Sequence, residues 1–173
     1  SKVQKQVDYP ITDLVTEKAQ ILRYSSSLLE AGICNADVLT VVASLKLVIV
    51  STTAAFAALR SDGSLVTWGH AARGGDSSEV IQQLKSGVEK VFSNQDAFAA
   101  VKDTGDVITW GEEEHGGDSS LAELCDVQQV FSTGTAFAAL KRDGSVVTWG
   151  KGKNGGDSSA VAEQLRRVQC IFS

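Results

Sequence analysis

The chain has few of the residues from which metal sites, disulfide frameworks and hydrolytic centres are built. Its 173 residues include three cysteines and two histidines. Cys34, Cys125 and Cys170 are odd in number and form no C-x-x-C pair, which argues against a disulfide framework and a zinc site and favours a reducing compartment. His70 and His115 fall at non-equivalent positions of the repeat described below. We therefore expect no metal and no cofactor.

Clustered positive charge and long apolar runs are also missing. The formal net charge is −5, and Lys and Arg do not gather anywhere, so nucleic acid is not an expected partner. A membrane-spanning helix needs about 20 predominantly apolar residues. The longest apolar stretch, 38–59, contains Lys46 and several Ser and Thr, so we expect no such span. With 43% hydrophobic and 21% charged residues, the composition is that of one soluble globular domain.

One pattern occurs three times. The copies read AFAALRSDGSLVTWG at 55–69, AFAAVKDTGDVITWG at 97–111 and AFAALKRDGSVVTWG at 136–150. Each is followed by a four-residue insert and then by GGDSS, at 74–78, 116–120 and 155–159. The period of about 40 residues is typical of solenoids and propellers. Because an active site needs only one copy, we interpret the repeated residues as architecture.

Each repeat predicts three short antiparallel strands, in the third copy at 129–132, 136–141 and 146–149. Asp143-Gly144 is the dipeptide that a two-residue type I′ hairpin prefers, whereas Thr104-Gly105 in the second copy is a weaker signal. Pairing outward from the turn places an alanine opposite each tryptophan. The expected pairs are Leu59–Val66, Ala57–Trp68, Val101–Ile108, Ala99–Trp110, Leu140–Val147 and Ala138–Trp149.

On this register, a phenylalanine of each repeat lies on the face opposite the tryptophan. Both faces of each sheet are then partly apolar, so we expect the sheets to stack, with all three tryptophans largely buried at equivalent places. The phenylalanines are Phe56, Phe98 and Phe137.

GGDSS is expected to open a short helical stretch in each repeat. Asp76 with Glu79, and Ser120 with Glu123, have the spacing of a capping box. Apolar pairs follow on one side of the helical turns, and then the first strand of the next repeat. The apolar pairs are Val80/Leu84, Leu121/Leu124 and Val161/Leu165, and the strands contain Val91-Phe92-Ser93, Val130-Phe131-Ser132 and Ile171-Phe172-Ser173.

The order apolar strand, D-G turn, T-W-G, loop, glycine pair and V-x-x-[VI] strand resembles the regulator-of-chromosome-condensation repeats of β-propellers. The short period is closer to the β-lactamase inhibitor protein type II branch, whose blades have three strands. GGDSS also resembles tandem repeats in predicted proteins of dinoflagellate algae. The resemblance covers about 47–173 and departs at the loop, where the family usually has a G-Q-L-G-like sequence. It implies a mainly β, open propeller-like array with repeats at about 47–88, 89–127 and 128–173.

Residues 1–46 do not follow the repeat. The apolar spacing from Ile11 to Leu29 fits an amphipathic helix at 12–31, with Thr12 as N-cap and Gly32 near its end. This helical segment either caps the first blade or docks on a partner. Family propellers usually close with seven blades, so the missing blades lie in a removed part of the chain, or a partner or the N-terminal segment covers the exposed edge. The start at Ser1 and the end at Ser173 suggest processing or trimming at both ends.

Catalysis and ion binding are weakly supported. A hydrolase using a GGDSS serine needs a base beside it, and the third copy has no histidine. Asp76, Asp118 and Asp157 lack a second acidic ligand at fixed spacing, so helix capping explains them better than a cation. We expect no catalytic residues.

The part that varies between copies is the insert between W-G and G-G-D. It is basic in the first copy, acidic in the second and basic in the third. Either these loops recognise a partner on a constant scaffold, or they are solvent-exposed loops whose sequence is free to change. As a hypothesis, the partner-binding residues are His70, Arg73, Glu112, Glu113, Glu114, His115, Lys151, Lys153 and Asn154.

We interpret the chain as a non-enzymatic protein–protein interaction or scaffold module, a peripheral subunit of a larger assembly. One alternative is an accessory subunit of an algal photosynthetic membrane complex, bound at its aqueous surface in the chloroplast and not spanning the thylakoid membrane. A serine hydrolase is the second alternative. Guanine-nucleotide exchange would rest on the resemblance alone.

Overall fold

The computed structural model describes residues 11–16, 21–22, 39–43 and 48–172. The chain divides into two compact units, Ser1–Lys46 and Leu47–Ser173. The first unit contains a small antiparallel sheet in the order β2-β1-β3, formed by β1 (Ile11–Thr16), β2 (Ile21–Leu22) and β3 (Leu39–Ala43).

The helix expected at 12–31 is wrong where the structure describes this range. β1 and β2 pair antiparallel, with Leu14 opposite Leu22 and Val15 opposite Ile21. β1 has the sequence ITDLVT, in which four of six residues are β-branched and therefore favour an extended backbone. The apolar residues of this range also fit a helical spacing, but the preference of the β-branched residues for an extended backbone outweighs that spacing. The rest of the expected helix lies outside the described residues.

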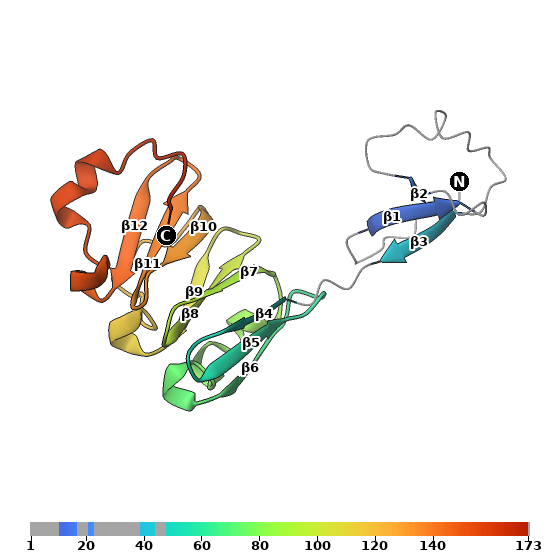
Figure 1. Ribbon diagram of the computed structural model, residues 1–173, viewed down its shortest axis with the longest axis horizontal. Helices are drawn as coiled ribbons and strands as arrows, with labels where there is room; N and C mark the ends of the chain where they lie inside the picture. The colour runs from blue at the N-terminus through green and yellow to red at the C-terminus, as the bar shows by residue number, and fades with distance from the viewer. Residues whose placement is uncertain (1–10, 17–20, 23–38, 44–47, 173) are drawn as a thin grey trace. The chain divides into compact units, whose positions relative to one another are not determined.

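The second unit is an open, propeller-like row of three sheets, here called blades 1, 2 and 3 (Figure 1). Each blade has three antiparallel strands in chain order, confirming the expected β units. Blade 1 contains β4 (Val48–Ser51), β5 (Ala55–Leu59) and β6 (Leu65–Gly69). Blade 2 contains β7 (Val88–Ser93), β8 (Ala97–Lys102) and β9 (Val107–Gly111). Blade 3 contains β10 (Val127–Ser132), β11 (Ala136–Lys141) and β12 (Val146–Gly150).

The second and third strands of each blade are joined by a three-residue loop, not by the expected two-residue turn. In blade 3, Gly144 N donates to Lys141 O at 3.0 Å, and Lys141 N donates to Ser145 O at 2.9 Å. Gly144 has a φ of 82°, whereas Asp143 does not have a positive φ. This is a type I turn followed by a glycine bulge, because a type I′ turn would require positive φ at both central residues.

The longer loop shifts the pairing by one residue, so the expected alanine–tryptophan pairs are wrong. The tryptophan of each blade lies opposite the phenylalanine, as in Phe137 opposite Trp149. A one-residue shift moves side chains to the other face, and the two rings therefore share a face and stack. The ring centroids are 5.3 Å apart in Phe56–Trp68, 5.1 Å in Phe98–Trp110 and 5.2 Å in Phe137–Trp149.

The blades stack face to face, as expected, and their two faces differ. The aromatic face of blade 2, with Phe98 and Trp110, packs against the small-residue face of blade 1, with Ala55 and Ala57. Blade 3 packs its aromatic face on blade 2 in the same way, so each joint joins one aromatic face to one small-residue face. Small side chains thus face large ones across each joint, the complementary sizes that a close-packed core requires.

Burial of the tryptophans at equivalent places is confirmed for two copies and wrong for one. Trp110 and Trp149 are each 5% exposed, whereas Trp68 is 45% exposed. The reason is positional: Trp68 lies on the aromatic face of blade 1, which has no preceding blade among the described residues.

The segments after GGDSS are less helical than expected. Short 3-10 helices follow in the first copy, η2 (Ser78–Val80) and η3 (Gln83–Lys85), and in the third, η6 (Ser159–Gln164). Residues 119–126 of the second copy contain no helix, and Leu121 is fully exposed.

The expected capping boxes are replaced by a local turn. Asp76 Oδ1 accepts from Ser78 N at 2.9 Å, Asp118 Oδ1 from Ser120 N at 2.8 Å, and Asp157 Oδ1 from Ser159 N at 2.9 Å. The aspartate thus bonds the backbone two residues ahead, and the glutamate three residues on is not needed.

The end of the chain begins to follow the path of a further blade. Val168 N donates to Gly144 O at 2.9 Å, as Val88 N does to Gly63 O and Val127 N to Gly105 O in the first strands of blades 2 and 3. Residues 168–172 nevertheless form no strand, so the strand expected at Ile171 is not observed in the described part.

Candidate functional site

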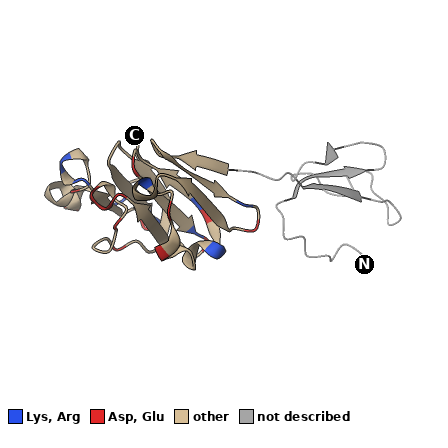
Figure 2. Cartoon of the chain, turned by 90° about the horizontal axis from the view of Figure 1, so that it is seen from below, with Lys and Arg blue, Asp and Glu red and all other residues tan. Residues whose placement is uncertain are grey.

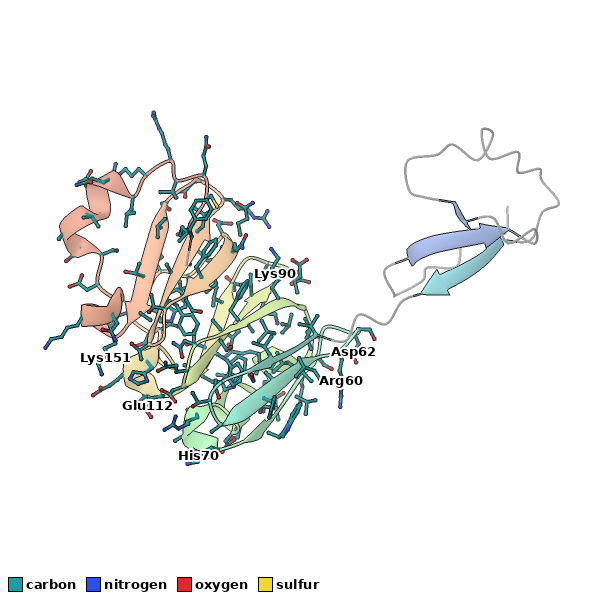
Figure 3. The ribbon with its side chains drawn as sticks, viewed as in Figure 1. Arg60, Asp62, His70, Lys90, Glu112 and Lys151 are labelled. Atoms are coloured by element: carbon teal, nitrogen blue, oxygen red, sulfur yellow. The ribbon has the colours of Figure 1, made fainter. Side chains whose placement is uncertain are left out.

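The three inserts lie at the same end of the three blades, opposite the glycine turns. Their first residues, His70, Glu112 and Lys151, follow one another along this end in Figure 3, whereas Asp62 of the first turn lies elsewhere. Each insert forms one 3-10 turn: η1 (Ala71–Arg73), η4 (Glu113–His115) and η5 (Gly152–Asn154). The topology therefore gathers into one row three segments about 40 residues apart in sequence.

The backbone of the inserts is the same in all three blades. The residue before each turn is extended, with ψ of 119°, 119° and 110°, and the glycine after it has φ of 88°, 97° and 106°. The second glycine of each pair donates its N–H to the first insert residue. These distances are 2.9 Å for Gly75 to His70 O, 2.8 Å for Gly117 to Glu112 O and 3.1 Å for Gly156 to Lys151 O.

The side chains on this constant backbone differ in charge. The first insert is HAAR, the second EEEH and the third KGKN. Most of these residues are exposed, and Glu112 and His115 are half-buried. Figure 2 views the chain from this side, and acidic and basic residues are interspersed there without one sign covering the face.

The last residue of the first two inserts contacts a buried carboxylate. Asp96, 8% exposed, accepts from Arg73 Nη1, and its other oxygen lies 2.9 Å from His115 Nδ1. Thr53 Oγ1 also donates to Asp96, at 3.2 Å. A buried charge is costly without partners, so Arg73 and His115 act first as internal contacts. Arg73 bonds to Asp96 across the joint between blades 1 and 2, and His115 bonds to Asp96 within blade 2.

Sequence reasoning missed Asp96, because the same position holds Ala54 in the first copy and Thr135 in the third. The signal was an acidic residue in one copy only, with basic side chains ending the inserts on either side of it. In blade 3 a neutral pair takes this place, with Asn154 Nδ2 donating to Thr135 Oγ1 at 2.6 Å. Arg73, His115 and Asn154 are therefore structural contacts as well as expected recognition residues.

An open groove of about 550 Å³ runs beside the inserts between the first two GGDSS segments. Its wall includes Asp76, Glu79, Glu113 and Asp118, and none of its lining residues is basic. The backbone N–H groups of Ser78 and Ser120 hold the pKa of Asp76 and Asp118 below the ordinary value of an aspartate. The groove is therefore negatively charged at neutral pH and is continuous with the acidic second insert.

The first serine of each GGDSS makes a structural hydrogen bond. Thr67 Oγ1 and Ser77 Oγ are 2.9 Å apart, and Thr109 and Thr148 donate to Ser119 and Ser158 at 2.9 Å. These contacts tie each GGDSS segment to the strand that carries the tryptophan. Within 48–172, the structure holds no group of three or more His, Cys, Asp and Glu side chains placed to share a metal ion.

No protein-family model matches this sequence, and no curated protein is similar to it. Among solved structures, human WBSCR16 is similar with 20% identity and a TM-score of 0.43, over 65% of this chain and 35% of that one. The ectodomain of the receptor kinase CR4 from Physcomitrella patens matches with 19% identity and a TM-score of 0.41, over 75% and 37%. Prp20p from Saccharomyces cerevisiae matches with 13% identity and a TM-score of 0.41, over 66% and 33%. The chain thus spans little more than a third of the length of these structures.

None of the helices in the described ranges combines the length and the apolar character needed to cross a bilayer.

Proposed function

We propose that residues 47–173 act as a non-enzymatic protein-binding scaffold whose recognition surface is the row of three inserts. The observation that carries this proposal is a backbone kept constant in three copies while its side chains change charge. Loops on a rigid scaffold are the usual carriers of recognition. In this view the blades hold the inserts in place, and the inserts select the partner.

The partner that fits best presents basic residues to blade 2. The second insert contributes Glu112, Glu113 and Glu114, and the neighbouring groove adds further carboxylates. His70 on one side, and Lys151 with Lys153 on the other, flank this acidic centre. Complementary charges of this kind favour one partner and one orientation over others. The module would therefore be a peripheral subunit, docked through this end.

A charge-reversal experiment tests the proposal. The chain is used to recover its partner from native extract, and the triple variant E112K/E113K/E114K is compared with the natural sequence. We expect the variant to recover much less partner and its remaining binding to depend less on salt, because the opposing charges no longer attract.

The matched control reverses three acids of the same unit outside the row, E89K/D103K/E123K, which are all exposed. The control should recover the partner as the natural chain does. Equal losses in both variants would mean that net charge matters and the inserts do not. Recovery of the chain with no partner from its native extract would contradict the subunit role.

Serine hydrolysis is the competing function. The hydrogen bonds that join Thr67, Thr109 and Thr148 to the first serine of each GGDSS support a structural role for these serines. A serine-reactive fluorophosphonate should leave the chain unlabelled, whereas stoichiometric labelling of one serine would favour the enzyme. Membership of an algal photosynthetic complex rests only on the resemblance of the GGDSS sequence to repeats of algal proteins. A thylakoid extract is the natural first source for the recovery experiment that tests it.

A further inference from the structure

The aromatic face of blade 1 is fully formed, and no residue of 48–172 covers it. Phe56 and Trp68 stack with an interplanar angle of 18°, against 17° and 22° for the covered pairs of blades 2 and 3. Yet Phe56 is 44% exposed, whereas Phe98 and Phe137 are at most 1% exposed. Val66 and Ile49 of the same blade are also exposed. Blade 1 therefore presents the same surface that the other blades use for packing.

The small-residue face of blade 3, at the other end of the row, is likewise not covered by any residue of 48–172. Ala138 is half-buried, whereas Ala57 and Ala99 at the same position are fully buried. Gly155 is exposed, while the equivalent Gly74 and Gly116 are buried. A side chain on Gly74 or Gly116 would collide with Phe98 or Phe137 of the following blade, but at Gly155 it would meet open space apart from Thr133.

The two joints inside the chain use one set of contacts twice. The indole N–H of the later blade donates to the first glycine of the pair: Trp110 to Gly74 O at 3.0 Å and Trp149 to Gly116 O at 3.1 Å. A serine hydroxyl of the later blade donates to the earlier blade: Ser93 to Ser51 O at 2.7 Å and Ser132 to Ser93 O at 2.8 Å. A backbone N–H of the earlier blade donates to the later one: Thr53 to Gln95 O at 2.8 Å and Gln95 to Gly134 O at 3.1 Å.

We propose that a second copy of this chain docks head to tail, placing the aromatic face of its blade 1 on the small-residue face of blade 3. Trp68 of the second copy donates to Gly155 O, and its Ser51 hydroxyl donates to Ser132 O. Gly134 N–H donates to Thr53 O of the second copy. Each of these contacts reproduces one that the chain already makes twice within itself, which is why a second copy fits better than an unrelated protein.

The charges at this joint allow the contact. The Arg73–Asp96 pair of the first internal joint corresponds to Asn154 and Ala54 at the proposed joint. Both residues are neutral, so this position of the proposed joint holds no charge that would need a partner. At the joint between blades 2 and 3 the equivalent residues are His115 and Thr135, and among the described residues no ion pair crosses that joint either.

A head-to-tail contact uses two different surfaces, so every added copy offers a free end. Such heterologous contacts close into rings where the rotation allows and otherwise extend as open arrays. At the internal joints the insert turns η1 and η4 contact the following blade, so the third insert lies at the proposed contact. The acidic second insert belongs to the middle blade and lies outside this contact, so the proposal does not depend on the function proposed for that insert.

Sedimentation velocity of the 173-residue chain at increasing concentration tests the proposal. We expect species larger than the 18.2 kDa monomer. W68E blocks the aromatic face and A138E blocks the small-residue face, and each should weaken association by roughly 30-fold or more, the loss typical of a central aromatic contact. L121S, which removes a fully exposed leucine from the middle of the row, should associate as the natural chain does, as should E112K/E113K/E114K.

Mixing the two blocked variants gives the decisive result. W68E retains a working small-residue face and A138E a working aromatic face, so an equimolar mixture should form a dimer and nothing larger. Circular dichroism and a cooperative melt establish that each variant is folded, and W68A with A138V are used if a charged variant is not. A natural chain that stays monomeric at high concentration overturns the proposal. So does association that survives both blocks, or a mixture that forms no dimer.

Discussion

Blades 1 and 2 contain the same aromatic pair in the same stack, and only one of the two pairs is buried. Phe56 lies directly opposite Trp68 on the paired strands, as Phe98 lies opposite Trp110. The stacking geometry is therefore set inside each blade by cross-strand pairing. Burial is set by the neighbour: blade 1 supplies it to Trp110, and nothing in 48–172 supplies it to Trp68. The comparison separates what a repeat determines by itself from what it needs another repeat to provide.

Truncating the tryptophans should destabilise the protein to different extents in the two blades. We expect Trp110→Ala to lower the free energy of unfolding by about 3–5 kcal/mol, as usual for a large aromatic side chain removed from a core. Trp68→Ala should lower it by less than about 1 kcal/mol, because half of the side chain is already in water. Urea denaturation at low protein concentration measures both values, and equal losses would contradict the difference in burial.

Alanine at the first glycine of the pair sharpens the comparison of the two ends. Gly74 and Gly155 both have a positive φ, so alanine costs about 1–2 kcal/mol of backbone strain at each. At Gly74 the new Cβ would also lie 2.4 Å from Phe98. This overpacking adds about 1–3 kcal/mol. Thermal melts should therefore show a clearly larger loss for Gly74→Ala, and similar losses would mean that the joint is not packed as described.

Asp96 distinguishes the two internal joints from one another. Asp96→Ala removes the acceptor shared by Arg73 and His115. We expect a loss of about 1–2 kcal/mol, toward the low end of charged hydrogen bonds because Arg73 can regain water. Thr135→Ala, at the equivalent position of blade 3, removes a neutral hydrogen bond with Asn154 and should cost about 0.5–1 kcal/mol. Added salt should narrow the gap between the variants, since only the first joint contains a charged pair.

The smallest expected effect is an acid-dependent one in the GGDSS turns. Backbone and hydroxyl hydrogen bonds from Ser78, Ser120 and Ser159 lower the pKa of Asp76, Asp118 and Asp157 in the folded chain. A lowered folded-state pKa adds stability above the unfolded pKa of about 4, and this stability is lost as the pH falls through the folded pKa.

The triple variant D76N/D118N/D157N keeps an oxygen acceptor in each turn but cannot titrate there. Its stability should fall less steeply than that of the natural chain below about pH 4. Changing Glu89 and Glu123 to Gln is the control, because these exposed carboxylates lie outside the turns. Identical acid profiles for all three chains would show that the turn bonds do not favour the ionised form.

The order and place of the strands could be predicted because each repeat carries its own signals. Alternating apolar residues, a glycine turn and the T-W-G strand recur three times, and repetition removed the ambiguity of any single copy. The register could not be predicted with the same success. Asp143-Gly144 suits both a type I′ turn and a type I turn with a glycine bulge, and the choice moves Trp149 from Ala138 to Phe137.

The contacts between blades could not be predicted from the sequence, for a different reason. Identical residues such as Trp68 and Trp110 have different surroundings, and the sequence of one repeat does not tell which blade covers which. The place of the inserts at one end followed from the repeat, whereas the bonds of Arg73 and His115 to Asp96 did not, because Asp96 occurs in one copy only. At 11–16 the sequence was compatible with a helix and with a strand, and the segment forms a strand because most of its residues are β-branched.

Hydrogen exchange of the three tryptophan indole N–H groups, followed by NMR, tests the central claim most directly. The chain has three tryptophans and so three separate indole signals, which single Trp-to-Phe variants assign. At low concentration we predict slow exchange for Trp110 and Trp149, which donate to Gly74 and Gly116, and fast exchange for Trp68. At high concentration Trp68 should become protected as a second copy covers it. Fast exchange of Trp110 and Trp149, or a Trp68 signal that is equally exposed at every concentration, would contradict this account.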